Sequence, residues 1–267
     1  MEISYISSIF GLIKNKDCHF DKIINNRELS NMNYDNPAAR LLSLITSGKE
    51  YPTNTLCRSV WETLLEVENN NPLLISRLGK VMELPDSIIS ALKEHFPSQH
   101  KSWAYWEPQV NGAFMSQNLN SEWATFINRI DDHSIAYLEL SADLLQTLAN
   151  TKSIVGDDMD DLRQRLNQIL SEVMESDISS EVKKFVARNI RKIIVSLDEY
   201  KLTGALPILD AIDATIGHAH VDKSYMSFLQ NSELGGKLLE TLAAAANVVT
   251  VAVGLPQLSQ AIALIAN

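Results

Sequence analysis

Residues 180–200 read SEVKKFVARNIRKIIVSLDEY, and this stretch has the clearest helical periodicity of the chain. Its apolar residues recur every three or four positions, at Val182, Phe185, Val186, Ile190, Ile193, Ile194 and Leu197. A helix turns once in 3.6 residues, so this spacing places all of them on one face. The pattern predicts an amphipathic α-helix over residues 180–200.

The same period extends outward along the chain in both directions. It predicts helices over residues 133–149 and 160–175, and earlier over 37–45, 53–68, 73–82 and 85–96. Prolines 37, 52, 72, 85 and 97 fall between these earlier segments, where they are typical of helix boundaries. Strand patterns are nearly absent. We therefore predict an all-α protein, a multi-helix bundle of roughly ten to twelve helices that leaves room for two helical subdomains.

One stretch, residues 97–120, shows little periodicity and holds Trp103, Trp106, Pro108 and Gly112. We interpret it as an ordered connecting loop. This divides the chain into an N-terminal helical subdomain (1–96), the Trp- and Pro-containing loop (97–120) and a C-terminal helical subdomain (121–267). A second, weaker boundary is indicated near residues 152–156.

Length and composition exclude several classes of protein. The chain has 267 residues, a formal net charge of −10 and two cysteines. Two cysteines are too few for a disulfide framework and are typical of a reducing cytosol. The apolar stretch near the N-terminus lacks a preceding basic region, and no run of 18 apolar residues occurs, so neither a secretory signal nor a standard transmembrane helix is indicated. We expect a cytoplasmic protein.

A row of cations lies on the polar side of the helix over residues 180–200. It consists of Lys184, Arg188, Arg191 and Lys192, which share one face by helical spacing. Such a row can contact an acidic protein or track the phosphates of a nucleic acid. It is also typical of the solvated face of an ordinary amphipathic helix, and the acidic net charge argues against nucleic-acid binding as the main role.

Metal binding has one weak candidate site in the stretch LDAIDATIGHAHVD. Asp210 and Asp213 are three residues apart and share a helix face, and His218 and His220 follow shortly after. Imidazole and carboxylate groups suit zinc, iron or manganese. The alternative is an ordinary helix end near Gly217, and we predict no cofactor. We also predict no catalytic residue, because Cys57 lies on an apolar helix face, where a buried thiol is usually inert.

The last 27 residues, 241–267, contain no charged side chain. Gly254 and Pro256 divide this tail into a helix over 236–253 and a shorter one over 257–266, together an apolar hairpin over 236–267. The hairpin can belong to the protein's own core, dock a partner or a second copy, or insert into a membrane. Its candidate contact residues are Val249, Val251, Val253, Leu255, Leu258 and Ile262.

These observations favour a non-enzymatic helical interaction protein that contacts a protein partner, or itself, through the basic helix face and the hairpin. We expect an accessory or adaptor subunit of a multi-protein assembly, of which a bacterial conflict or phage-defence complex is one example. The first alternative is a membrane-acting effector that inserts its C-terminal hairpin. The second is a metal-dependent hydrolase that uses Asp210, Asp213, His218 and His220.

Overall fold

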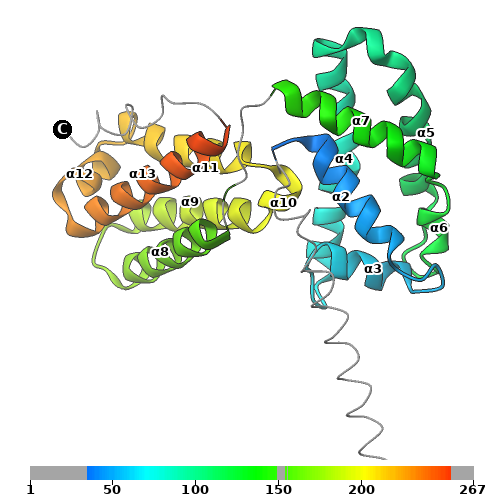
Figure 1. Cartoon of the computed structure of the whole chain (residues 1–267). Coiled ribbons are helices and arrows are strands. Elements are labelled where there is room, and N and C mark those ends of the chain that lie inside the picture. Colours follow the sequence, from blue (N-terminus) through cyan, green and yellow to red (C-terminus); the bar gives the residue numbers. More distant parts are fainter. Residues whose placement is uncertain (1–34, 149–153, 155, 254–267) are drawn as a thin grey trace, which may run out of the picture. The chain divides into compact units, whose positions relative to one another are not determined.

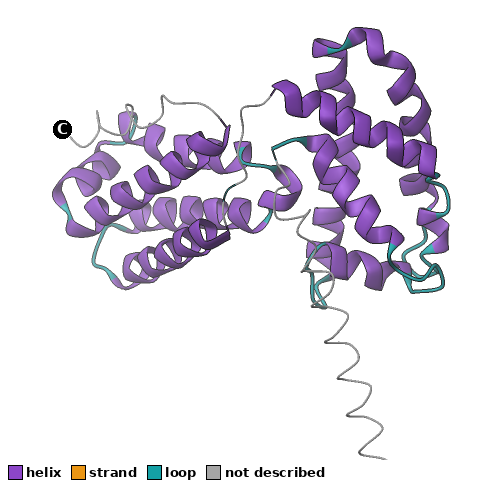
Figure 2. Cartoon of the chain, in the orientation of Figure 1, coloured by secondary structure: helices purple, strands orange, loops and turns teal. Residues whose placement is uncertain are grey.

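The computed structural model describes residues 35–148, 154 and 156–253. Within these residues every regular element is a helix, as Figures 1 and 2 show, and the α-helices number twelve. Among the described residues, β-type pairing is limited to one isolated bridge between Leu56 and Glu122. The prediction of an all-α protein is confirmed.

The N-terminal group of helices runs from α2 to α7. Its members are α2 (Pro37–Lys49), α3 (Cys57–Leu64), α4 (Asn71–His95), α5 (His100–Ser116), α6 (Ala124–Ile127) and α7 (Asp132–Leu148), with a 3-10 turn at Pro97–Gln99. Helices α2 and α5 each pack against both α4 and α7. Aromatic rings fill the space beside α3 and α6, where Trp61 meets Trp123 edge-on with 5.2 Å between ring centroids. Residues 132–148 therefore pack with the N-terminal helices, whereas the sequence analysis assigns them to the C-terminal subdomain.

The C-terminal group runs from α8 to α13. It comprises α8 (Gly156–Glu175), α9 (Ser180–Asp198), α10 (Tyr200–Thr203), α11 (Leu206–Gly217), α12 (Lys223–Asn231) and α13 (Glu233–Val253), with a 3-10 turn at His218–His220. Helix α9 packs against α8 and α11, and α13 packs against α8, α11 and α12. These helices share one hydrophobic core.

Helix α9 follows the predicted period closely. The Ser179 hydroxyl accepts a hydrogen bond from the Val182 amide at 3.3 Å and so caps the first turn. Five of the seven residues in the apolar stripe are buried, namely Val182, Val186, Ile190, Ile193 and Leu197, and Phe185 and Ile194 pack against the same core. The short helix α10 then ends at Gly204, whose φ of 74° is a conformation that glycine adopts without steric strain.

Two prolines lie inside helices, contrary to the sequence analysis, which places Pro85 at a boundary and Pro108 in a loop. Pro85 is buried within α4, a single helix where two were predicted, and Pro108 lies within α5. An interior proline costs about 3 kcal/mol because it removes a backbone hydrogen bond. In α4 the buried positions continue in phase across the proline, at Leu78, Val81, Leu84, Ile88 and Leu92, and this burial offsets the cost.

The predicted connecting loop over residues 97–120 is wrong for most of its length, because α5 occupies His100–Ser116. The two tryptophans that the sequence analysis places in this loop are the start of a helical stripe. Its buried members recur at helical spacing, at Trp103, Trp106, Val110, Ala113 and Phe114. Helix α3 is also shorter than predicted, since it spans only Cys57–Leu64.

The apolar C-terminal hairpin is not supported. Helix α13 turns its small and apolar residues into the core of the C-terminal group, where Leu238, Leu242, Ala245, Ala246 and Val249 are fully buried. Val249 is therefore a core residue, which corrects its prediction as a partner contact. Val251 and Val253 belong to α13 by their backbone alone, and Leu255, Leu258, Ile262 and the predicted second helix lie outside the described residues. Among the described helices, none is long and apolar enough to cross a membrane.

A pair of adjacent glycines in α13 tests the close packing of α12 against α13. A methyl group added at Gly235 would lie 2.1 Å from the Phe228 carbonyl oxygen, whereas one at Gly236 would meet nothing within 4 Å. We expect Gly235→Ala to lower the free energy of unfolding by about 1–3 kcal/mol, as overpacking does. Gly236→Ala should leave it unchanged or raise it by up to about 1 kcal/mol, since alanine favours a helix interior. Urea unfolding of both variants is the measurement, and equal effects would contradict the packing described.

Candidate functional site

The described surface with the clearest binding character is the polar side of α9. Between Val182 and Leu197 the helix carries five cations and no carboxylate, although the whole chain is acidic. Four of these cations are exposed and form no ion pair with any described residue, namely Lys184, Arg188, Arg191 and Lys192. The arginines of α8 differ, since Arg163 pairs with Asp198 at 2.7 Å and Arg165 with Asp161 at 2.8 Å. The cations of α9 are thus available to a ligand.

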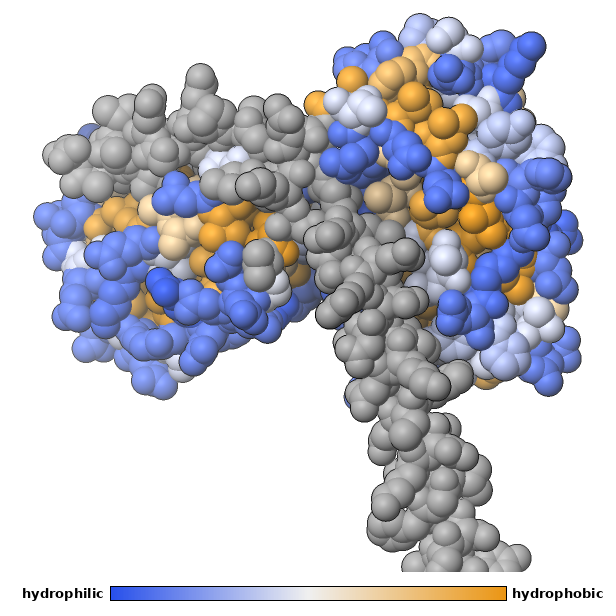
Figure 3. Space-filling model, in the orientation of Figure 1, coloured by the Kyte–Doolittle hydropathy of each residue, from blue (hydrophilic) through white to orange (hydrophobic). Residues whose placement is uncertain are grey.

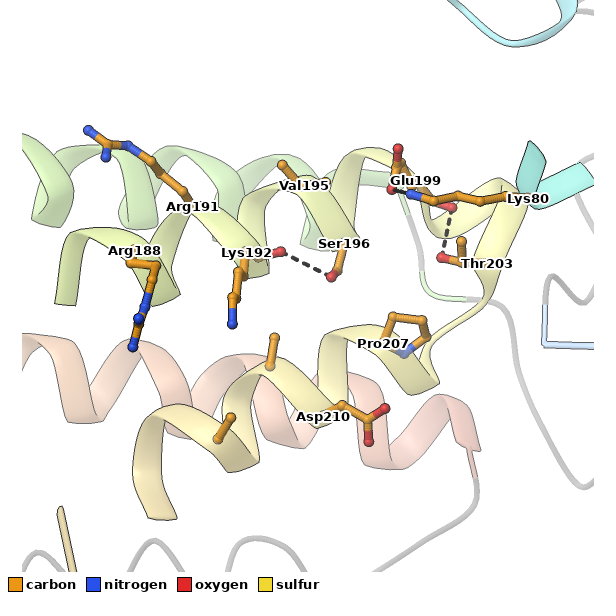
Figure 4. A pocket seen from close by; sticks show the side chains of 12 residues that line it. Lys80, Arg188, Arg191, Lys192, Val195, Ser196, Glu199, Thr203, Pro207 and Asp210 are labelled. Atoms are coloured by element: carbon orange, nitrogen blue, oxygen red, sulfur yellow. Dashed lines mark hydrogen bonds and ion pairs between the residues drawn. The ribbon is translucent and has the colours of Figure 1, made fainter. Parts of the chain in front are cut away.

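A groove with a volume of about 700 Å³ runs along this side of α9, between α9 and α11. Figure 4 shows Arg188 and Lys192 of α9 directed toward α11 at one end of the groove. Pro207 and Asp210 of α11 lie toward the other end, together with Glu199, Thr203 of α10 and Lys80 of α4. The groove therefore has a cationic end and an end of mixed charge.

The floor of the groove is apolar and built from small side chains. Ala211 and Ala214 of α11 and Val195 of α9, a residue that is 51% exposed, supply its apolar lining. Alanines three residues apart lie on one side of a helix, and they leave open the space that larger side chains would fill. An aliphatic side chain of a ligand can bury itself against Val195 and these two methyl groups.

The mixed end is closed by a buried carboxylate. Glu199 is only 4% exposed and forms an ion pair with Lys80, and the Arg77 Nε lies 3.7 Å from the second carboxylate oxygen. Arg77 is itself buried and donates hydrogen bonds to the Leu65 carbonyl at 2.7 Å and the Glu66 carbonyl at 3.0 Å. Two cations thus compensate the charge of Glu199, as a buried carboxylate requires.

The four predicted cations do not converge on one site. Arg188, Arg191 and Lys192 all line the groove, but Figure 4 shows Arg188 and Lys192 directed toward α11 and Arg191 directed away from it. Arg191 and Lys184 also line a smaller hollow of about 270 Å³ beside Met174, with Ser180, Lys183 and Ala187. Arg188 and Lys192 are therefore the two cations directed into the groove, Arg191 borders both hollows, and Lys184 lies on the side of α8.

Aromatic rings beside Arg188 limit its movement. Its guanidinium carbon lies 5.6 Å from the centroid of the Phe185 ring, a cation–π contact. Phe185 in turn stacks on His218 with 3.8 Å between ring centroids. Arg188 is thus held over a fixed aromatic pair, which lowers the entropy lost when a ligand binds it.

The surface around α9 differs from that of the N-terminal helices. Figure 3 shows hydrophilic residues covering α8, whereas hydrophobic residues gather over α7, where Tyr137, Leu140 and Leu148 are exposed. The groove beside α9 combines unpaired cations with a hollow and is the candidate binding site.

The geometry does not support the candidate metal site at Asp210, Asp213, His218 and His220. Among the described residues no group of three metal-binding side chains lies close enough to hold an ion. The His218 Nε2 lies 3.4 Å from Asp222, which accepts hydrogen bonds from the Ser224 and Tyr225 amides and so caps α12. Partial burial and the negative charge of Asp210 raise the pKa of the Asp213 carboxyl. Asp210 itself holds no metal ligand position among the described residues and lines the groove between α9 and α11.

Sequence reasoning found the cations of the groove and named Asp210 only as a candidate metal ligand, and it missed the remaining lining residues. Val195 lies on the same helix face, three residues beyond Lys192. A single exposed valine hardly changes the apolar pattern of the helix, so the sequence does not single it out. Ala211 and Ala214 carry a usable signal, since small residues three apart on a helix mark a place of close approach or open space. Lys80 has no such signal, because tertiary packing alone brings α4 to this end.

Comparisons with known proteins add no relative. No protein-family model matches the chain, and no curated protein or solved structure matches it. The function is therefore argued from the geometry of the described residues.

The second chemical candidate, Cys57, is tested by its reactivity. Its side chain is fully buried, and this burial raises the pKa of the thiol to about 11. At pH 8 about one thiol in a thousand is then ionised, and only the thiolate reacts rapidly. In a Cys18→Ser variant we expect iodoacetamide to leave Cys57 unmodified in native protein and to label it fully in 8 M urea, as followed by mass spectrometry. Rapid labelling of the native protein would show that the thiol is accessible and activated.

Proposed function

We propose that this chain is a non-enzymatic interaction protein, an adaptor subunit of a multi-protein assembly, that binds an acidic partner protein through the groove between α9 and α11. The observation that carries the proposal is the pair Arg188 and Lys192. Both are exposed, neither is in an ion pair with a described residue, and both point into a groove with an apolar floor. Surface cations that the fold does not neutralise are well suited to bind a partner's carboxylates.

The polar groups of the groove suit binding better than chemistry. Its buried carboxylate, Glu199, is neutralised by Lys80 and Arg77, so its charge already serves the fold. Ser196 donates its hydroxyl hydrogen bond to the Lys192 carbonyl at 3.0 Å, within its own helix. A nucleophile needs a neighbouring base to activate it, and the described residues place none beside Ser196.

A protein is a better partner than a nucleic acid. The net charge of −10 repels a polyanion at long range, and Asp210 adds a negative charge at one end of the groove. The described side chains that line the groove include no aromatic ring on which a base can stack. An apolar floor between charged ends is instead typical of a protein interface, where a hydrophobic centre is surrounded by a polar rim.

The proposal predicts which charges a partner depends on. Reversing Arg188 and Lys192 together, to glutamate, should weaken the binding of a partner by tenfold or more, a loss of about 1.4 kcal/mol for each factor of ten. The matched control is Lys93→Glu with Lys101→Glu, which changes the net charge equally at two exposed cations on α4 and α5. Partners are captured from cells of the source organism by each tagged protein and quantified by mass spectrometry.

We expect the same partner to be retained by the wild-type protein and the control and to be lost by the Arg188/Lys192 variant. Circular dichroism and light scattering establish that all three proteins are folded and share one oligomeric state. Equal recovery of every partner by the three proteins would contradict the proposal.

A further inference from the structure

The groove constrains its occupant by the spacing of its charges. Arg188 and Lys192 are four residues apart on α9, which places them about 6 Å apart along the helix axis at 1.5 Å per residue. Alternate residues of an extended chain are about 6.6 Å apart and point to the same side. Two carboxylates at alternate positions of an extended peptide therefore match the two cations.

The apolar floor follows the cations in the same direction along α9. Val195 lies three residues beyond Lys192, which is about 4.5 Å further along the axis, and Ala211 and Ala214 of α11 line the same groove. The next alternate residue of an extended peptide reaches this floor. Full burial of an aliphatic side chain contributes about 1.5–3 kcal/mol, an upper bound for a groove that is open on one side.

The far end of the groove disfavours a continuous run of negative charge. Asp210 lies beyond the floor, and Glu199 is already compensated by Lys80 and Arg77, so this end offers no free cation among the residues that line it. Extending a run of acidic residues past the floor would bring like charges together. Acidic residues at one end and an aliphatic residue in the middle suit this arrangement better than a uniform polyanion.

We infer that the groove binds a short extended segment of the partner protein with two acidic residues and one large aliphatic residue at alternate positions. The carboxylates pair with Arg188 and Lys192, and the aliphatic side chain packs against the apolar lining of the groove. This inference rests on the proposed function and adds to it the chemistry of the partner segment and the order of its side chains along the groove.

Two fluorescein-labelled peptides test the inference by fluorescence anisotropy with the full chain. The first carries Glu, Glu and Leu at alternate positions between glycines and serines, and the second carries Ser in place of Leu. We expect the leucine peptide to bind at least fivefold more tightly in low salt. A single-stranded oligodeoxynucleotide of similar length should bind more weakly than the leucine peptide.

Ala214→Trp is the decisive variant, because it fills the floor without changing any charge. Ala214 is exposed, so the substitution projects into the groove and leaves the core intact. The variant should bind the leucine peptide only as tightly as the serine peptide and should leave the affinity for the serine peptide unchanged. Val195→Thr is a second variant of nearly the same shape, and it should weaken the leucine peptide alone by about twofold to fivefold. It keeps the test valid if the tryptophan variant unfolds, as judged by its thermal transition.

The outcomes separate this inference from the proposed function. Equal affinities for the two peptides, or a leucine peptide unaffected by both floor variants, would overturn the inference while leaving the charge-dependent binding of a partner in place. Failure of both peptides to bind would also overturn it. Tighter binding of the oligonucleotide, abolished by the Arg188/Lys192 reversal, would assign the groove to a nucleic acid and overturn the inference and the proposed function together.

Discussion

Burial of the apolar stripe of α9 is the interaction on which the rest of the C-terminal helices depends. Val186, Ile190 and Ile193 are fully buried, in one core shared with α8, α11 and α13. Because the rotation of a helix is fixed once one side is buried, the residues between the stripe positions must face outward. Rotating α9 to hide its cations would place unpaired charges in an apolar core, at a large cost in free energy. The apolar half of the helix therefore determines where its basic half lies.

The groove then depends on what faces α9 from its neighbours. Ala211 and Ala214 keep space open on α11, and the ion pair of Glu199 with Lys80 closes one end with a compensated charge. Arg188 is steadied over Phe185 by a ring contact that also involves His218. His218, a candidate metal ligand in the sequence, instead packs on Phe185, beside the arginine that points into the groove.

Sequence periodicity predicted the helices whose buried face is long and uninterrupted. It succeeded for α7, α8 and α9 to within a few residues at each end. It failed at Pro85 and Pro108, because local rules treat proline as a helix end while the buried residues around each proline stabilise a continuous helix. It also failed to distinguish the possible roles of Val249, because an uncharged helix has the same local pattern whether its own core, a partner or a lipid covers it. Contacts with α8, α11 and α12 resolve that choice for the described part of α13.

The site was predictable in its charge and not in its shape. Helical spacing brought together Lys184, Arg188, Arg191 and Lys192, but their division between two sides of α9 depends on where α8 and α11 pack. Lys80 joins the groove through packing between residues distant in sequence, which no local pattern encodes.

Amide chemical-shift mapping by NMR during titration with the leucine peptide shows which residues the peptide contacts. We expect the shifts to concentrate on both walls of the groove, at Arg188, Lys192 and Val195 of α9 and at Ala211 and Ala214 of α11. Shifts confined to Lys184, Arg191 and the α8 side of the helix, or spread over the N-terminal helices, would contradict this expectation.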